Sequence, residues 1–270
     1  MSSTLARTQS VGRAAARWGK VWWRILHLGA LLAALALAPS SWRRPWRTRT
    51  AEQVWRSSAP LLPSFALLTT LVSLVIMRIV LVTALSYGLS QYALQMVVRV
   101  LVLELIPLTA ALFVAMRVSL PQAVEVAALR ERDALVAMRR EGEDVLGTQI
   151  LPRALGSGFS VLLLAAISSV ICLVLAYLVV HGFSPWGLPR YTRVVGQVFE
   201  PTVTLIFSLK VLAMAVAVSV IPLGSALHDR SEADPQSPLH ASSGVELKGL
   251  VRMFAAILLI EMASLAGNYV

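Results

Sequence analysis

The sequence predicts an all-α integral membrane protein. It has an N-terminal interfacial helix, five transmembrane helices and a cytoplasmic coupling helix between spans 2 and 3. Three observations support this fold class. Of the 270 residues, 57% are hydrophobic and only 14% are charged, with a mean hydropathy of +0.73. Several apolar runs reach the roughly 20 residues that a helix needs to cross a bilayer. One strongly charged stretch, residues 121–149, interrupts these runs.

Basic residues are concentrated near the amino terminus. The net charge is +10, and ten of the 24 Lys and Arg residues precede residue 60. They flank apolar segments, as the positive-inside rule expects of cytoplasmic flanks, and they lack a folded nucleic-acid recognition domain. We therefore expect a cytoplasmic amino terminus and no nucleic-acid partner. Cys172 is the single cysteine, and the four histidines are not at ligand spacing, so no metal site is predicted.

The first apolar block is residues 25–38, ILHLGALLAALALA, within a basic segment that covers residues 1–58. The block is too short to cross roughly 30 Å of hydrocarbon comfortably, and both of its flanks are basic. We therefore predict an interfacial or re-entrant helix, with Trp18, Trp22 and Trp23 at headgroup depth. A true membrane span is the alternative.

Residues 59–270 form the predicted five-span membrane domain. The short turn at Tyr87-Gly88 carries no charge and is placed on the outer side. The loop over residues 181–193 is also expected outside, with Trp186 and Tyr191 as candidate interface anchors. A polar loop over residues 228–244 is expected in the cytoplasm, which leaves the carboxyl terminus outside. The expected spans cover about residues 61–86, 91–117, 155–180, 201–227 and 249–268.

Residues 121–149 have a different character from the spans. Charges of both signs alternate with apolar residues at spacings of three to five, which is typical of an amphipathic helix outside the bilayer. Pro121 suits the first turn of such a helix, and Gly142 suits its end. This helix is a candidate docking site for a partner. A merely solvated connector helix is the alternative.

Four charged residues inside the apolar runs are candidates for a substrate path or a buried charge: Glu104, Lys210, Arg99 and Arg78. A carboxylate near the middle of a span costs roughly 2.5 kcal/mol or more, so Glu104 needs a partner. Lys210 lies at comparable depth, and we predict that the two pair across the bundle, as a structural lock or beside a substrate path. Arg99 lies roughly 140° from Glu104 around an α-helix and is a poor partner for it. Arg78 and Arg117 are near helix ends, where arginines usually extend to the headgroups.

Catalytic motifs are absent from the sequence. It contains no G-x-x-x-x-G-K-[ST], no G-x-S-x-G and no HExxH. We therefore do not expect an enzyme. If the protein moves a substrate uphill, the energy must come from a partner or an ion gradient.

Residues 104–156, ELIPLTAALFVAMRVSLPQAVEVAALRERDALVAMRREGEDVLGTQILPRALG, carry a more specific signal. This stretch resembles the signature of the MCE-associated ABC permeases, the MlaE/YrbE family. Asp133 also falls where that family has an acidic residue, and weaker similarity extends over most of residues 20–265. The gapless matches are Glu104, Pro107, Ala110, Ala111, Arg117, Glu125, Arg130, Gly142, Asp144, Pro152, Arg153 and Leu155.

The resemblance implies a permease subunit of an ABC-type phospholipid transporter in the bacterial inner membrane. The implied partners are a cytoplasmic ABC ATPase, a periplasmic MCE-domain protein, a STAS-domain accessory protein, and a second permease copy in a homo- or heterodimer. ATP and Mg²⁺ would be used by the ATPase, and no cofactor is expected in this chain. Phospholipid would occupy a cavity between the permease halves. The implied ATPase-coupling residues are Glu125, Arg130, Asp133, Arg139, Gly142 and Asp144.

The sequence also departs from the family pattern. Ile106, Met116 and Ser119 replace family glycines, while Leu103 replaces the usual Arg and Val211 the usual Ser. Because glycines let membrane helices approach closely, these changes suggest altered packing, a different partner or one half of a heterodimer. Two alternatives stay open: a partner-independent channel or secondary carrier, and a degenerate permease that serves as an assembly scaffold.

Overall fold

The computed structural model describes the backbone of residues 2–38, 44–228 and 238–269, and the side chains of residues 19–38, 47–89, 92–227 and 247–268. Every secondary-structure element in these ranges is a helix, so the chain is all-α, as predicted. Within them, six helical stretches are long and apolar enough to cross a membrane. These are Gly19–Leu37, Arg47–Ser86, Tyr92–Glu131, Leu146–His181, Pro201–Leu227 and Leu247–Asn268.

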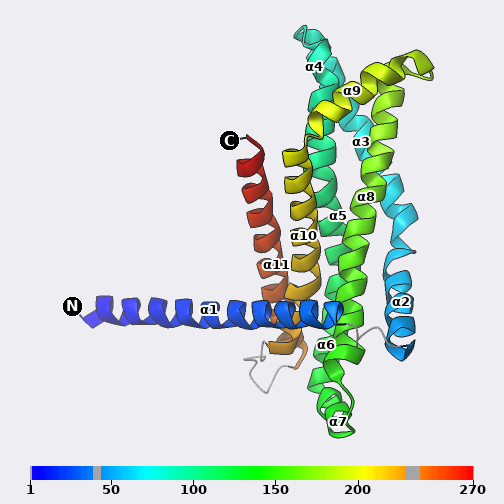
Figure 1. Cartoon of the computed structure of the whole chain (residues 1–270). Coiled ribbons are helices and arrows are strands. Elements are labelled where there is room, and N and C mark those ends of the chain that lie inside the picture. Colours follow the sequence, from blue (N-terminus) through cyan, green and yellow to red (C-terminus); the bar gives the residue numbers. More distant parts are fainter. Residues whose placement is uncertain (1, 39–43, 229–237, 270) are drawn as a thin grey trace.

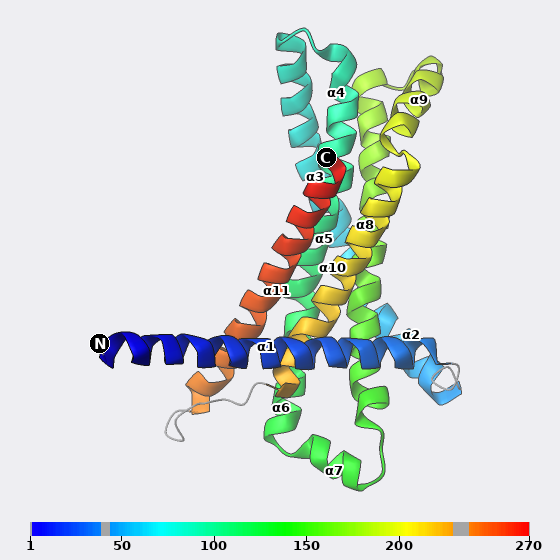
Figure 2. The same ribbon diagram turned by 60° about the vertical axis from the view of Figure 1, so that its left-hand side comes forward.

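The first helix, α1 (Ser2–Leu37), runs across one end of the bundle instead of along it (Figures 1 and 2). Its apolar part is longer than the predicted block of residues 25–38 and reaches the length of a membrane span. One face, with Ile25, Leu28 and Leu32, is buried against the bundle. The spacing of three and four is that of an amphipathic helix. The crossed orientation suits the predicted interfacial position, which stays a prediction.

The tryptophans of α1 differ in their surroundings. Trp23 is exposed, whereas Trp22 is partly buried and packs against the core. The side chain of Trp18 lies outside the described residues.

Two helices follow α1 and form one edge of the bundle. Helix α2 (Arg44–Ser58) packs against α8 (Leu151–His181), and the hydroxyls of Ser58 and Ser160 lie 2.9 Å apart in a hydrogen bond between them. Helix α3 (Leu61–Ser86) has the bounds predicted for the first span.

The second span and the beginning of the charged segment form one continuous helical run. It ends at Glu131, well beyond the predicted end of the span at residue 117. Pro121 lies in the first turn of α6 (Leu120–Glu131), the last helix of this run, and a position in a first turn was predicted for it. The parts are α4 (Ser90–Val97), the π-helical η2 (Val98–Leu105), α5 (Ile106–Val114), the π-helical η3 (Ala115–Ser119) and α6 (Leu120–Glu131).

The prediction of one helix over residues 121–149 was wrong. The run breaks at Asp133, whose φ of 53° is left-handed, a conformation that aspartate tolerates better than most residues. A short helix, α7 (Ala134–Arg140), follows, and Gly142, two residues after its last residue, has a left-handed φ of 84°. A π-helical turn, η4 (Leu146–Ile150), then leads into α8. The charged segment is therefore a helical hairpin with α7 at its tip (Figure 2).

The predicted outer loop over residues 181–193 is also more ordered than expected. It contains a single turn of 3₁₀ helix, η5 (Pro185–Gly187), and the helix α9 (Leu188–Val198). Trp186 is exposed, but Tyr191 is buried and donates a 2.7 Å hydrogen bond to the Leu173 carbonyl. Burial raises the pKa of Tyr191 to about 12, which keeps this donor protonated. Tyr191 is thus a core residue, because α9 turns its apolar face inward.

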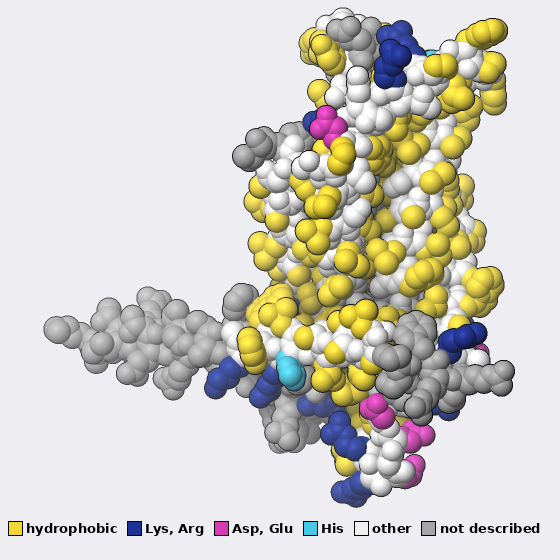
Figure 3. All heavy atoms as spheres, viewed as in Figure 1, with side chains coloured by type: hydrophobic (Ala, Val, Ile, Leu, Met, Phe, Trp, Pro, Cys, Tyr) yellow, Lys and Arg dark blue, Asp and Glu magenta, His cyan; other side chains and the backbone are white. Residues whose placement is uncertain are grey.

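Helices α10 (Pro201–His228) and α11 (Pro238–Tyr269) complete the bundle. The predicted polar loop over residues 228–244 lies largely outside the described residues, and α11 begins within it. Helix α10 is central and packs against α8, α11 and α6. Large apolar side chains such as Leu71, Leu209 and Leu259 are exposed on the bundle surface. Figure 3 shows hydrophobic side chains along the bundle, with charged side chains gathered toward its ends, as expected of a multi-pass membrane protein.

Close packing of α1 on α10 depends on a glycine. A Cβ added at Gly224 would lie 3.1 Å from Cγ1 of the buried Ile25, whereas nothing lies within 4 Å of a Cβ at Gly196. Gly224→Val is therefore expected to destabilise the protein by about 1–3 kcal/mol through overpacking. Thermal unfolding in detergent measures this, with Gly196→Val as the matched control. Equal melting temperatures for the two variants would contradict the close contact.

Candidate functional site

Lys210, near the middle of α10, lies at the centre of a cluster of charged side chains. Its side chain is only 1% exposed. The ammonium group forms an ion pair with Glu104 of η2 and another, at 2.9 Å, with Glu261 of α11. It also donates a 3.2 Å hydrogen bond to the Leu103 carbonyl. An ammonium group has three donors, so Lys210 is fully satisfied.

The predicted ion pair between Glu104 and Lys210 is therefore present, and the structure adds a second carboxylate to it. Sequence analysis missed Glu261, although a signal was available: it is the one acidic residue in the predicted span over residues 249–268. An ionisable residue within an apolar span normally has a partner or a function. The three charges connect η2, α10 and α11, which are far apart in the sequence.

Arg99 lies on the same side of the π-helical segment η2 as Glu104. The two residues line a small cavity of about 10 Å³ together with Leu103, Val203 and Asn268. As predicted, Arg99 forms no ion pair with Glu104, whose partner Lys210 is on another helix, but the expected separation of 140° assumed an α-helix. Residues 98–105 are π-helical, with i→i+5 hydrogen bonds, so residues five apart return to nearly the same side.

One ammonium group, that of Lys210, contacts both carboxylates of the cluster, and Arg99 lies beside Glu104 without an ion pair to a described residue. The amide of Asn268 donates a 3.3 Å hydrogen bond to the second oxygen of Glu104. Within the described part of the chain, Arg99 Nε and Glu261 Oε2 are buried without a hydrogen-bond partner. The donors of Lys210, by contrast, are all used.

Arg78 does not belong to this cluster. It lies on an exposed face of α3, between Val75 and Ile79, which are also exposed. Arg117 is exposed as well. Both positions suit side chains that extend toward lipid headgroups.

The six residues expected to couple to an ATPase fall into two groups. Glu125 is within 3.6 Å of Arg153, and Arg130 donates a 3.1 Å hydrogen bond to the Ala226 carbonyl. These two residues hold the charged hairpin to α8 and α10. Asp133, Arg139, Gly142 and Asp144 are exposed around α7. We call residues 132–144 the α7 tip, which projects beyond α1 at the end of the molecule (Figure 1).

Comparison with known proteins identifies the family to which the chain is similar. A family model described as Permease MlaE matches residues 50–265. The matched range contains the charge cluster and the α7 tip, whereas α1 lies before it. A search of curated proteins gives no match.

Proposed function

This chain belongs to the MlaE permease family, the membrane subunits of ABC-type lipid transporters, and from this premise we propose its specific role. It moves phospholipid between the bacterial inner membrane and an MCE-domain protein on the periplasmic side. The hydrolysis of ATP takes place in a separate cytoplasmic ATPase. The single observation that carries this proposal is the family match, which covers every span of the bundle from α3 to α11.

The α7 tip is the proposed contact with the ATPase. Four of its residues, Asp133, Arg139, Gly142 and Asp144, are exposed at the end of the molecule. The tip is attached to the bundle through Glu125 and Arg130, which make contacts with α8 and α10. A movement of the tip would therefore reach the helix that carries Lys210. This arrangement suits a coupling element, because it joins an exposed charged surface to the buried charges.

The proposed topology follows from this assignment. The α7 tip and the amino terminus lie in the cytoplasm, α1 lies in the membrane interface, and the carboxyl terminus lies on the periplasmic side. Two permease subunits, in a homo- or heterodimer, would enclose the phospholipid. A STAS-domain protein is a further possible subunit.

Gentle affinity purification of the chain from its native membrane tests the proposal. Mass spectrometry should identify a Walker-motif ATPase and an MCE-domain protein among the recovered partners. Bound phospholipid alone would say little, because many membrane proteins retain lipid. Recovery of the intact chain without any ATPase would overturn the proposal and favour a channel, a secondary carrier or a scaffold.

A further inference from the structure

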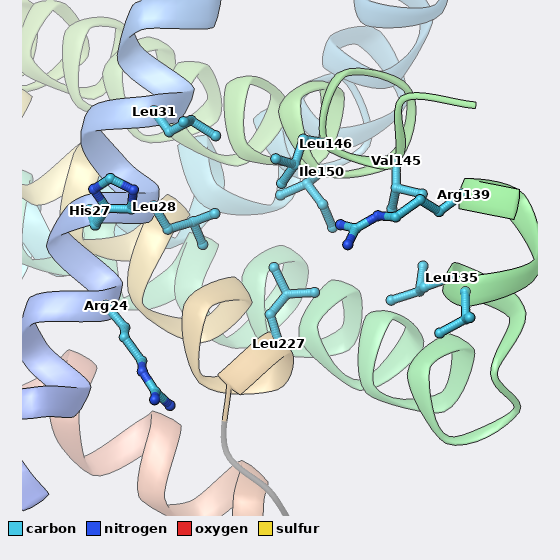
Figure 4. A pocket seen from close by; sticks show the side chains of 11 residues that line it. Arg24, His27, Leu28, Leu31, Leu135, Arg139, Val145, Leu146, Ile150 and Leu227 are labelled. Carbon is cyan, nitrogen blue, oxygen red and sulfur yellow. The ribbon is translucent and has the colours of Figure 1, made fainter. Parts of the chain in front are cut away.

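A pocket of about 510 Å³ lies beneath α1, away from the buried charge cluster. Four elements from distant parts of the sequence form its walls: α1, α7, the segment around η4, and the end of α10 (Figure 4). The volume is within the range of small-molecule sites. Because α7 forms one wall, the pocket connects the α7 tip to the N-terminal helix.

Three basic side chains line the pocket, and none of its lining residues is acidic. Arg24 and His27 are three residues apart and share one face of α1, and Arg139 enters from α7 on the other side (Figure 4). All three side chains are exposed. None of them forms a hydrogen bond or an ion pair with another described residue. Their charges and donors are therefore available to a ligand, and the excess of positive charge selects an anion.

The rest of the pocket is apolar. Leu28 and Ile150 are buried in its wall, and Leu31, Leu135 and Leu227 contribute partly exposed surface. A small hydrophilic anion would leave this surface in contact with water. A ligand with an anionic head and a hydrocarbon tail would cover both parts, because apolar burial adds to the charge interaction.

The position of the pocket narrows the class of ligand. Helix α1 crosses the end of the bundle, and Figure 3 shows hydrophobic side chains along its upper edge and basic side chains below the left part of its described segment. An amphipathic helix of this kind lies at the depth of lipid headgroups. Basic residues at that depth attract anionic lipids.

We propose that this pocket binds one anionic phospholipid. Its anionic headgroup lies at the basic rim that Arg24 and His27 of α1 and Arg139 of α7 form, and the first part of its acyl chains lies along the leucines between them. The lipid would join α1 to the α7 tip and so make the position of the tip sensitive to anionic lipid. The proposal rests on the interfacial position proposed above for α1, but the binding step does not require transport or an ATPase.

Two double variants test the site. Arg24→Gln/Arg139→Gln removes two charges that line the pocket. Lys20→Gln/Arg140→Gln removes two exposed charges from the same two helices, neither of which lines it. Native mass spectrometry of the full chain in detergent measures the affinity for phosphatidylglycerol and for phosphatidylcholine with identical acyl chains. A photoactivatable phosphatidylglycerol then locates the bound lipid by the peptides that it labels.

The wild-type chain should bind one phosphatidylglycerol in preference to phosphatidylcholine, with labelling in α1 and in residues 135–150. The pocket variant should bind phosphatidylglycerol about 30-fold more weakly, and the control variant should stay within about threefold of wild type. Equal losses in both variants, or no loss in either, would overturn the proposal. Displacement of the lipid by a comparable concentration of glycerol 3-phosphate would also overturn it, because the site would then recognise a soluble phosphate.

Discussion

Lys210→Met is expected to lower the free energy of unfolding by about 3–5 kcal/mol, because it leaves two carboxylates in the bundle without the cation that contacts both. Glu104 and Glu261 form ion pairs with this one ammonium group, whose side chain is 1% exposed. The two carboxylate side chains are largely buried, with 14% and 12% exposure, within apolar spans. Thermal and denaturant unfolding in detergent measure the loss. Lys248→Met, which removes an exposed lysine from α11, is the matched control and should change stability little.

A triple variant separates charge from packing at the same site. Glu104→Gln/Lys210→Met/Glu261→Gln removes all three charges with little change in volume. Removing a complete buried ion network is often neutral, so this variant should regain most of the stability that Lys210→Met loses. If the triple variant is as unstable as the single one, the loss comes from packing around position 210, and the ion pairs are not its cause.

The second large effect is expected from Asp144→Lys in the α7 tip. This substitution reverses an exposed charge where the chain is proposed to contact its ATPase. A like charge at such an interface costs several kcal/mol, so binding of the ATPase should weaken by at least about tenfold. Lipid-stimulated ATP hydrolysis should fall with it. Titration of the purified ATPase against the permease in nanodiscs measures both.

Glu200→Lys provides a close control for Asp144→Lys. Both acidic residues are exposed, and the carbonyl of each accepts a 2.9 Å backbone hydrogen bond from a threonine four residues later. The two substitutions therefore make the same change in charge in the same local setting, but Glu200 lies at the opposite end of the bundle. Equal ATPase binding by wild type and by both variants would show that the α7 tip is not part of the ATPase interface.

The spans were predictable because apolar length is a strong signal. The first span was predicted at residues 61–86, and α3 has those bounds. The charged segment was less predictable, since its amphipathic period continues through Asp133, where the backbone turns left-handed. No periodicity separates a long helix from two helices joined at one residue. The helix α9 was missed for a related reason: a short amphipathic segment between spans resembles a loop.

The buried charges were predictable in part. Depth within the spans was enough to pair Glu104 with Lys210. The position of Arg99 depends on π-helical geometry, which the residue types did not indicate. Glu261 could have been found by its place in an apolar span. Of the three positions where the resemblance predicted glycine, Ile106 and Ser119 are in the core at 2% and 1% exposure, whereas Met116 is exposed. The core has thus accommodated two larger residues without losing the fold of the bundle.

ATP-driven lipid movement through this chain is the central claim, and transfer of labelled phospholipid in proteoliposomes tests it most directly. The chain, its ATPase and its MCE-domain partner would be reconstituted together and supplied with ATP or a non-hydrolysable analogue. Transfer is expected only with hydrolysable ATP, and only when the permease is present. Transfer at the same rate without ATP, or transfer that follows an imposed ion gradient, would contradict it.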